Sequence, residues 1–270
     1  MKRIGLFGAD FENSKKIVTS GKYSLTAGMP NPIHMSLLNR LFTVIFCVFF
    51  FFGIMVYFLL ISLPSNLGKG TDVRYLSYDA AILIRSIGAF LKPVSLLVDV
   101  GFLVASIPVF WPKKRLSSQV FTYFPFYFPW ASSVFLAVFY LASAAAFDAY
   151  TMLGFGLQLI VGIAFFIWIV INSIQNLKRQ LNDEEPKPIL KKVLLMTLGM
   201  MALLFPVSLV YHLVNKLPVL WYFYPFGLFL IVLFVVYAYL VAFLINAHIV
   251  QAYYILSLIH ISEPTRLQLI

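Results

Sequence analysis

The chain has 270 residues, of which 61% are apolar and only 11% are charged, and its net charge at pH 7 is +10. Because a soluble domain carries about 25% charged residues, and about 45–50% apolar ones, this composition excludes a soluble globular protein. An excess of Lys and Arg is also typical of nucleic-acid-binding proteins, but membrane proteins commonly retain basic residues on their cytoplasmic loops. We therefore expect the lipid bilayer, and not nucleic acid, to be the main partner.

The first apolar segment follows a polar and basic N-terminal region. Residues 1–40 are expected to form a cytoplasmic arm. Residues 41–63 contain no charged side chain, and as a helix they would reach about 34 Å, enough for the ~30 Å hydrocarbon core of a bilayer. This run is too long, and lies too far from the N-terminus, for a cleavable signal peptide. We therefore expect it to be the first transmembrane span.

The second apolar segment carries a charge and is preceded by an amphipathic stretch. Residues 93–111 are long enough to span a bilayer, although Asp99 interrupts them. In residues 78–92 the polar side chains, including Arg85 and Lys92, fall close to one helical stripe, and apolar residues cover the rest. This pattern predicts a separate helix that lies in the membrane interface, or else a buried hairpin arm.

Four further apolar segments complete a predicted set of six spans. The short turn at residues 148–150 predicts that the third and fourth spans form an antiparallel hairpin, and small Ala and Gly residues on both allow close packing. The sequence therefore predicts an all-α fold, a polytopic transmembrane helical bundle with six spans and one interfacial amphipathic helix. Residues 248–255 are expected on the cytoplasmic side. The last four predicted spans are residues 129–147, 151–174, 193–214 and 219–247.

The positive charge is concentrated on alternate connections between these segments. Residues 1–40, 113–115 and 178–192 hold fourteen of the twenty Lys and Arg residues. Short connections rich in Lys and Arg stay in the cytoplasm, so six spans with both ends inside agree with every connection. A five-span arrangement would place basic connections outside. We therefore expect a multi-pass cell-membrane protein with a cytoplasmic N-terminus, and a prokaryotic cytoplasmic membrane is its plainest setting.

A few polar side chains gather on the predicted outer side of the bundle. If the second span begins at residue 93, Asp99 lies about 9 Å below its outer end. Gln158 has a similar depth, and His212 lies near the outer end of its span. With Arg85 and Lys92 they form a candidate intramembrane polar site, since ionisable side chains in bilayers usually face a protein interior or a water-filled cavity. Such a site would take a cation, a proton or an amine, whereas the alternative is that Asp99 pairs with Arg85 or Lys92 and only anchors its span.

Three functional hypotheses from different classes remain open. The first is a transporter or permease for a small ion or polar solute, with Asp99 on its path. The second is a membrane sensor or scaffold module whose cytoplasmic C-terminal domain lies beyond this chain. The third, an intramembrane enzyme using Asp99 and His212, is disfavoured because no two catalytic groups share a span at a useful spacing. The sequence has no phosphate-binding loop, zinc pair or nucleophile elbow, so we expect no cofactor and no metal, and partner subunits stay open.

Residues 256–270 are expected to have a different origin from the rest of the chain. The run Leu256-Ser-Leu-Ile-His-Ile-Ser-Glu-Pro-Thr-Arg266 resembles the conceptual translation of a transposon-end sequencing adapter. This resemblance implies that the natural sequence ends near Ile255 and that the chain is a truncated fragment. We therefore expect residues 256–270 to have no part in the natural fold. Residues 1–255 carry no family motif that we recognise.

Overall fold

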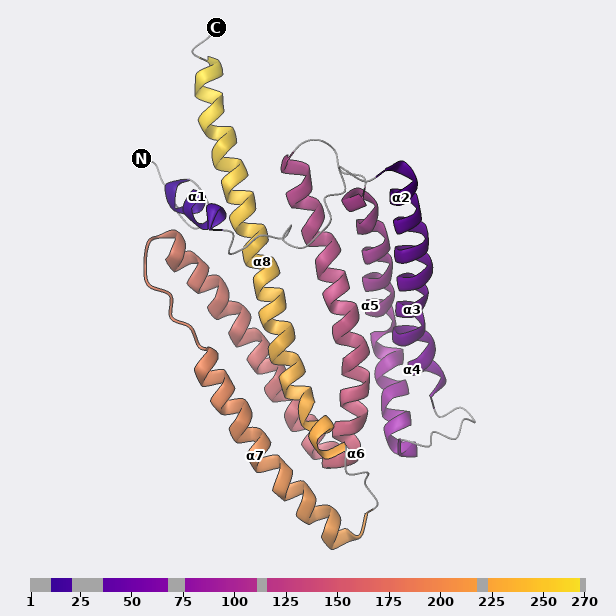
Figure 1. Cartoon of the computed structure of the whole chain (residues 1–270). Helices are drawn as coiled ribbons and strands as arrows, with labels where there is room; N and C mark the ends of the chain where they lie inside the picture. Colours follow the sequence, from indigo (N-terminus) through magenta and orange to yellow (C-terminus); the bar gives the residue numbers. More distant parts are fainter. Residues whose placement is uncertain (1–10, 21–35, 68–75, 111–115, 218–222, 268–270) are drawn as a thin grey trace.

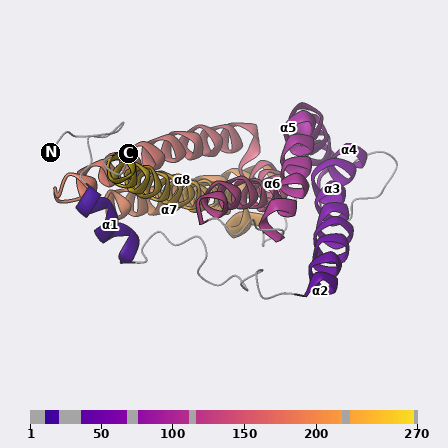
Figure 2. The same cartoon turned by 90° about the horizontal axis from the view of Figure 1, so that it is seen from above.

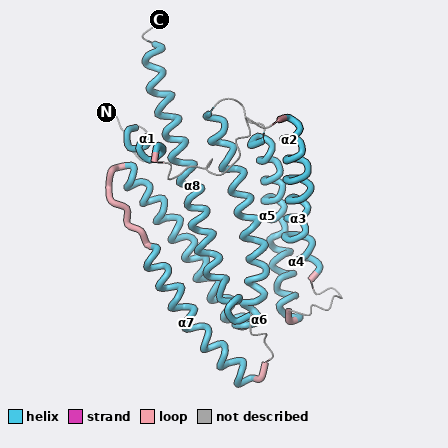
Figure 3. The backbone as a smooth tube through the Cα atoms, in the orientation of Figure 1, coloured by secondary structure: helices cyan, strands magenta, loops and turns pink. Residues whose placement is uncertain are grey.

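The computed structural model describes residues 11–20, 36–67, 76–110, 116–217 and 223–267. All regular secondary structure in these ranges is helical (Figure 3). Five of the described helices are long and apolar enough to cross a membrane. The long helices run side by side as a bundle (Figure 1), in agreement with the expected all-α membrane class.

The first apolar segment forms one rod of successive α-helical and π-helical turns. Ser36 caps its start, because its side chain accepts a hydrogen bond from the backbone N–H of Asn39 at 3.3 Å. Near its end, Pro64 packs against Gly88, where an added Cβ would lie only 2.6 Å from the proline Cβ. The parts of the rod are α2 (Leu37–Phe42), η2 (Thr43–Gly53), α3 (Ile54–Tyr57), η3 (Phe58–Ser62) and α4 (Leu63–Asn66).

A single helix, α5 (Tyr78–Phe110), covers both the expected interfacial helix and the expected second span. The structure does not divide this stretch at Pro93. A proline inside a membrane helix removes one backbone hydrogen bond, but packing against neighbouring helices tolerates it. The buried face continues across the proline, from Ile84 and Gly88 to Ser95 and Asp99. Asp99 therefore lies 21 residues after the start of a continuous helix, about 31 Å along its axis.

The longest helical stretch, α6 (Leu116–Leu181), turns back on itself at Thr151. Thr151 has φ 59° and ψ 179°, which breaks the helix into arm 1 (residues 116–150) and arm 2 (residues 152–181). The two arms run in opposite directions in Figure 1. The bend adjoins the turn expected at residues 148–150, so the hairpin between the third and fourth apolar segments is present in the structure.

Helix α8 (Phe223–Leu267) packs against both arms of α6. On arm 1, the backbone at Gly227 approaches Ala145 so closely that an added Cβ would lie 2.9 Å from its carbonyl oxygen. On arm 2, a Cβ added at Gly162 would lie 2.5 Å from the ring of Phe234. Small residues therefore allow these helices to approach, as is usual inside membrane bundles.

Two further helices lie at the edges of this core. Helix α7 (Leu190–Asn215) is largely exposed and apolar, with Leu194 and Leu195 both more than half exposed. The short helix α1 (Phe11–Thr19) packs where arm 2 ends: Asn13 Nδ2 donates to the carbonyl oxygen of Leu181 at 3.2 Å, and Ile17 packs near Val250. In Figure 2, α5 and the α2–α4 rod lie together at one end of an elongated arrangement.

The contact between α8 and arm 1 predicts a difference between two glycine substitutions. Gly227→Ala places a methyl group against backbone atoms that cannot rotate away, and is expected to lower the free energy of unfolding by about 1–3 kcal/mol. Gly156→Ala is the matched control, because no atom of the described residues lies within 4 Å of its added Cβ. Unfolding in mixed micelles measures both variants, and equal effects would contradict the close helix contact.

Candidate functional site

The bend of α6 is tied to the start of α5 by a carboxylate. The backbone N–H of Ser77 donates to Asp148 Oδ2 at 3.1 Å, and the Ser77 hydroxyl donates to Asp148 Oδ1. The Ser77 oxygen in turn accepts a hydrogen bond from the N–H of Ala80 at 3.1 Å, which caps the first turn of α5. Asp148 therefore acts through Ser77 to fix where α5 begins.

The same bend is held by α7 and α8. The Ser208 hydroxyl of α7 donates to the carbonyl oxygen of Ala149. His212 Nε2 lies 3.2 Å from the carbonyl oxygen of Asp148, and its Nδ1 lies 3.1 Å from the carbonyl oxygen of Ser208. The Tyr150 hydroxyl donates to the carbonyl oxygen of Tyr224, at the start of α8, at 2.6 Å. We call this set the bend junction: Ser77, residues 148–151, Ser208, His212 and Tyr224.

A second polar region lies inside the bundle, on α5. Asp99 is 6% exposed, and its Oδ1 has no hydrogen-bond partner among the described residues. Ser95, one helical turn earlier on the same face, is fully buried, and its hydroxyl also lacks a partner in the described part of the chain. The hydroxyl of Tyr140, on arm 1, lies close to that of Ser95, but neither oxygen completes a hydrogen bond.

The two arms of α6 contribute further buried polar groups. Gln158 of arm 2 is fully buried, and both atoms of its amide lack a partner among the described residues. Ser143 of arm 1 is also fully buried with an unpartnered hydroxyl. The two positions lie seven and eight residues from Thr151 on opposite arms, so the hairpin places them at the same level. We call Ser95, Asp99, Tyr140, Ser143 and Gln158 the interior polar cluster.

The five residues expected to form one site therefore separate. His212 belongs to the bend junction, which contains the residue that caps α5, whereas Asp99 lies about 33 Å further along that helix. Lys92 is exposed and Arg85 is half-buried, and in the described ranges neither forms an ion pair with Asp99. Asp99 and Gln158 are both buried in the interior but at different levels, since Gln158 lies about 10 Å from the bend along arm 2.

Sequence reasoning missed three members of the interior polar cluster. Ser95 could have been identified from the sequence, because it precedes Asp99 by one turn and would lie on the same face of any helix. Tyr140 and Ser143 gave no such signal, since hydroxyl side chains are common in membrane helices and usually bond to their own backbone. Ser132 and Ser133 of arm 1 do so, donating to the carbonyl oxygens of the residues four positions earlier.

The interior polar cluster contains one carboxylate, three hydroxyl groups and one amide. Hydroxyl and amide groups both donate and accept hydrogen bonds, and a carboxylate accepts them when ionised. Over the described residues, no three His, Cys, Asp or Glu side chains come together as a metal-binding group. The arrangement suits a proton, a small cation or water.

Comparisons of the chain with protein-family models, with curated proteins and with solved structures give no match. They transfer no ligand and no activity to this chain.

The bend junction predicts the effect of removing one hydroxyl. Tyr150→Phe deletes the hydrogen bond to the Tyr224 carbonyl and is expected to lower the free energy of unfolding by about 0.5–1.5 kcal/mol. Tyr211→Phe is the control, because Tyr211 is 47% exposed on α7. Both are measured by unfolding in mixed micelles, and a Tyr150→Phe protein as stable as the control would show that this bond does not hold α8 to the bend.

Proposed function

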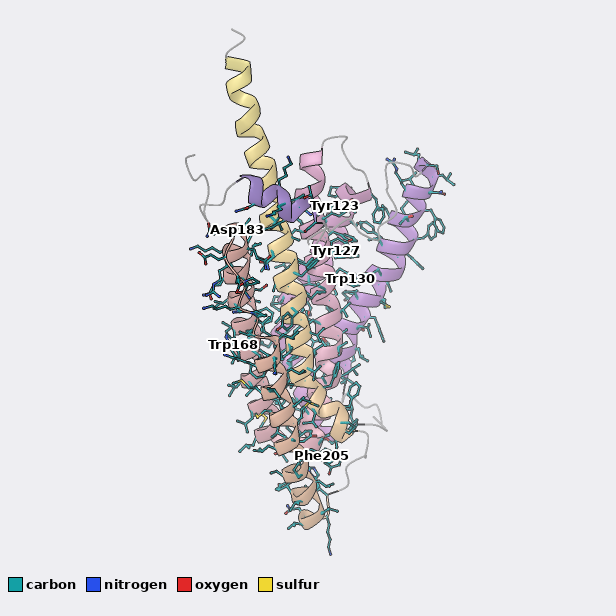
Figure 4. All side chains as sticks on the ribbon, turned by 60° about the vertical axis from the view of Figure 1, so that its left-hand side comes forward. Tyr123, Tyr127, Trp130, Trp168, Asp183 and Phe205 are labelled. Carbon is teal, nitrogen blue, oxygen red and sulfur yellow. The ribbon has the colours of Figure 1, made fainter. Side chains whose placement is uncertain are left out.

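We propose that the chain crosses the membrane six times with both ends on the cytoplasmic side. The five long apolar helices support this, because α6 turns back at Thr151 and supplies two crossings. Helix α1 packs against Leu177 and Leu181 at the end of arm 2, the stretch that also carries Lys178 and Arg179. The N-terminal helix and a Lys- and Arg-rich connection therefore share one end of the bundle. Tyr123 and Asp183 lie toward that end, and Phe205 lies toward the opposite one (Figure 4).

This topology predicts which added cysteines react from outside the cell. Cys47 is the only cysteine, so a Cys47→Ser protein provides a background without thiols. Asn215→Cys, at the exposed end of α7, should react with a membrane-impermeant maleimide in intact cells. Asp183→Cys, in the exposed connection after arm 2, should react only after the cells are opened. The reverse pattern, or equal labelling of both, would contradict the orientation.

We further propose that the protein is a permease that moves protons or small cations through Asp99. The observation that supports this most directly is the buried carboxylate with an unpartnered oxygen on a helix long enough to cross the membrane. Ionisable side chains are expensive inside a bilayer, and they usually mark ion pathways or proton relays when they face the protein interior. Because Asp99 forms no ion pair with Arg85 or Lys92 in the part of the chain that the structure describes, its carboxylate is open to a transported cation.

The neighbouring groups favour the same function. The hydroxyl of Ser95, one turn from Asp99, and the nearby hydroxyl of Tyr140 offer neutral oxygen ligands or hydrogen-bond donors. Pro93 and Pro108 lie within the same continuous helix, and each proline leaves one backbone carbonyl of that helix without its usual N–H donor. No described contact favours the sensor or scaffold hypothesis in a comparable way.

Replacing the carboxylate tests this function. The purified protein is reconstituted in liposomes that contain a pH-sensitive dye, and a potassium diffusion potential drives protons inward. Asp99→Asn keeps the shape of the side chain but removes its charge, and it is expected to reduce proton flux at least about tenfold, which corresponds to ~1.4 kcal/mol. Asp183→Asn, in an exposed connection, should leave the flux unchanged.

The same liposomes test other small cations. Uptake of sodium or of methylammonium replaces proton flux as the readout if the carried cation is not the proton. The permease function would be wrong if the wild-type protein moved none of these above protein-free liposomes, or if Asp99→Asn carried them as fast as the wild type.

A further inference from the structure

Ser143 and Gln158 lie in the interior of the bundle where nothing in the described structure satisfies them. Both residues are fully buried, and the Ser143 hydroxyl and both atoms of the Gln158 amide lack hydrogen-bond partners among the described residues. One turn further along arm 2, Gly162 faces the ring of Phe234, so apolar packing fills the next layer. Ser143 and Gln158 therefore lie at one level of the α6 hairpin, next to an apolar layer.

Burying an amide without hydrogen-bond partners is unfavourable in free energy, and this favours bound water at Gln158. Burying an unsatisfied amide or hydroxyl is strongly unfavourable, and a bilayer offers no bulk water to compensate. Buried polar groups that lack protein partners are commonly bridged by ordered water. An amide with donors and acceptors beside a hydroxyl matches the hydrogen-bonding needs of water molecules.

The five members of the interior polar cluster follow one another along the bundle. Ser95 and Asp99 are one turn apart on α5, and Tyr140 and Ser143 are one turn apart on arm 1. The hydroxyls of Ser95 and Tyr140 lie close together across the contact between these helices. Ser143 and Gln158 share a level about 10–12 Å from the bend at Thr151. The series therefore extends from Asp99 toward the end of the bundle where α6 turns.

We propose that Ser143 and Gln158 hold water molecules that carry protons between the bend end of the bundle and Asp99. This inference rests on the proposed permease function and assigns the proton as its substrate. Each water accepts one proton and passes one on, so neither the amide nor the hydroxyl changes its charge, and Asp99 takes up and releases one proton per passage. A metal cation is a poor fit to this level, because two neutral side chains supply too few oxygen ligands to replace its hydration shell.

The test compares proton flux for substitutions that remove these polar groups. Gln158→Leu puts an apolar side chain of similar size in an apolar layer, and is expected to reduce proton flux at least about tenfold, corresponding to ~1.4 kcal/mol, without lowering the thermal midpoint. Gln158→Asn, which keeps an amide, should retain part of the flux. Ser143→Ala should reduce the flux, whereas its matched control Ser133→Ala should not, because Ser133 is 2% exposed on the same arm and donates to the Pro129 carbonyl at 2.9 Å.

A second measurement detects the water itself. Hydroxyl-radical footprinting with a short X-ray pulse modifies buried side chains next to bound water. Labelling is expected at Tyr140 in the wild type and is expected to fall in the Gln158→Leu protein. Absence of labelling at Tyr140 in the wild type would overturn the proposal without reference to any transport assay.

The outcomes separate this inference from the permease function. If Asp99→Asn stops proton flux but Gln158→Leu does not, the water path is wrong and the permease function stands. If Gln158→Leu lowers the thermal midpoint sharply, the amide is bonded within the protein, and the water path is again wrong. If Asp99→Asn and Gln158→Leu both leave the flux of an active wild type unchanged, both proposals fall.

Discussion

The return of α6 at Thr151 is the constraint on which the other contacts of the bundle depend. A β-branched residue rarely adopts a positive φ, and such a conformation persists only when its surroundings enforce it, at a cost of order 1–3 kcal/mol. Here the surroundings are the hydrogen bonds of the bend junction, which come from α5, α7 and α8. Residues 148–151 thus determine where α5 begins, and they hold α7 and the first turn of α8 to the bend.

Once the two arms are fixed, α8 completes the core along both of them. Gly227 of α8 packs against arm 1, and the ring of Phe234 of α8 packs against Gly162 of arm 2. Because neither glycine has a side chain, the helices can approach closely at these two positions. Further along α8, Asn246 donates to the hydroxyl of Ser173 on arm 2 at 2.8 Å. Apolar residues alone would not specify this arrangement, because lipid tails offer them an equally good environment.

Polar groups inside the bundle fall into two classes with different consequences. Those of the bend junction, together with Ser132 and Ser133, have bonds within the protein and stabilise one conformation. The atoms of the interior polar cluster lack such bonds in the described structure, although they are as deeply buried. This contrast between bonded and unbonded buried polar groups is the physical basis of both functional proposals.

The sequence by itself determined the membrane class, the all-α content and the hairpin of α6. Hydrophobic length and charge content decide whether a segment is stable in lipid, and turn residues act on the local backbone, so all three are local properties of the sequence. Only the tertiary structure decided that α5 continues through Pro93, since packing on both sides of the proline offsets its missing hydrogen bond. In the structure Asp99 lies far from His212 along α5, and Ser95 lies close to Tyr140 of arm 1. Such neighbours depend on how separate helices cross, and no periodicity within one segment carries that information.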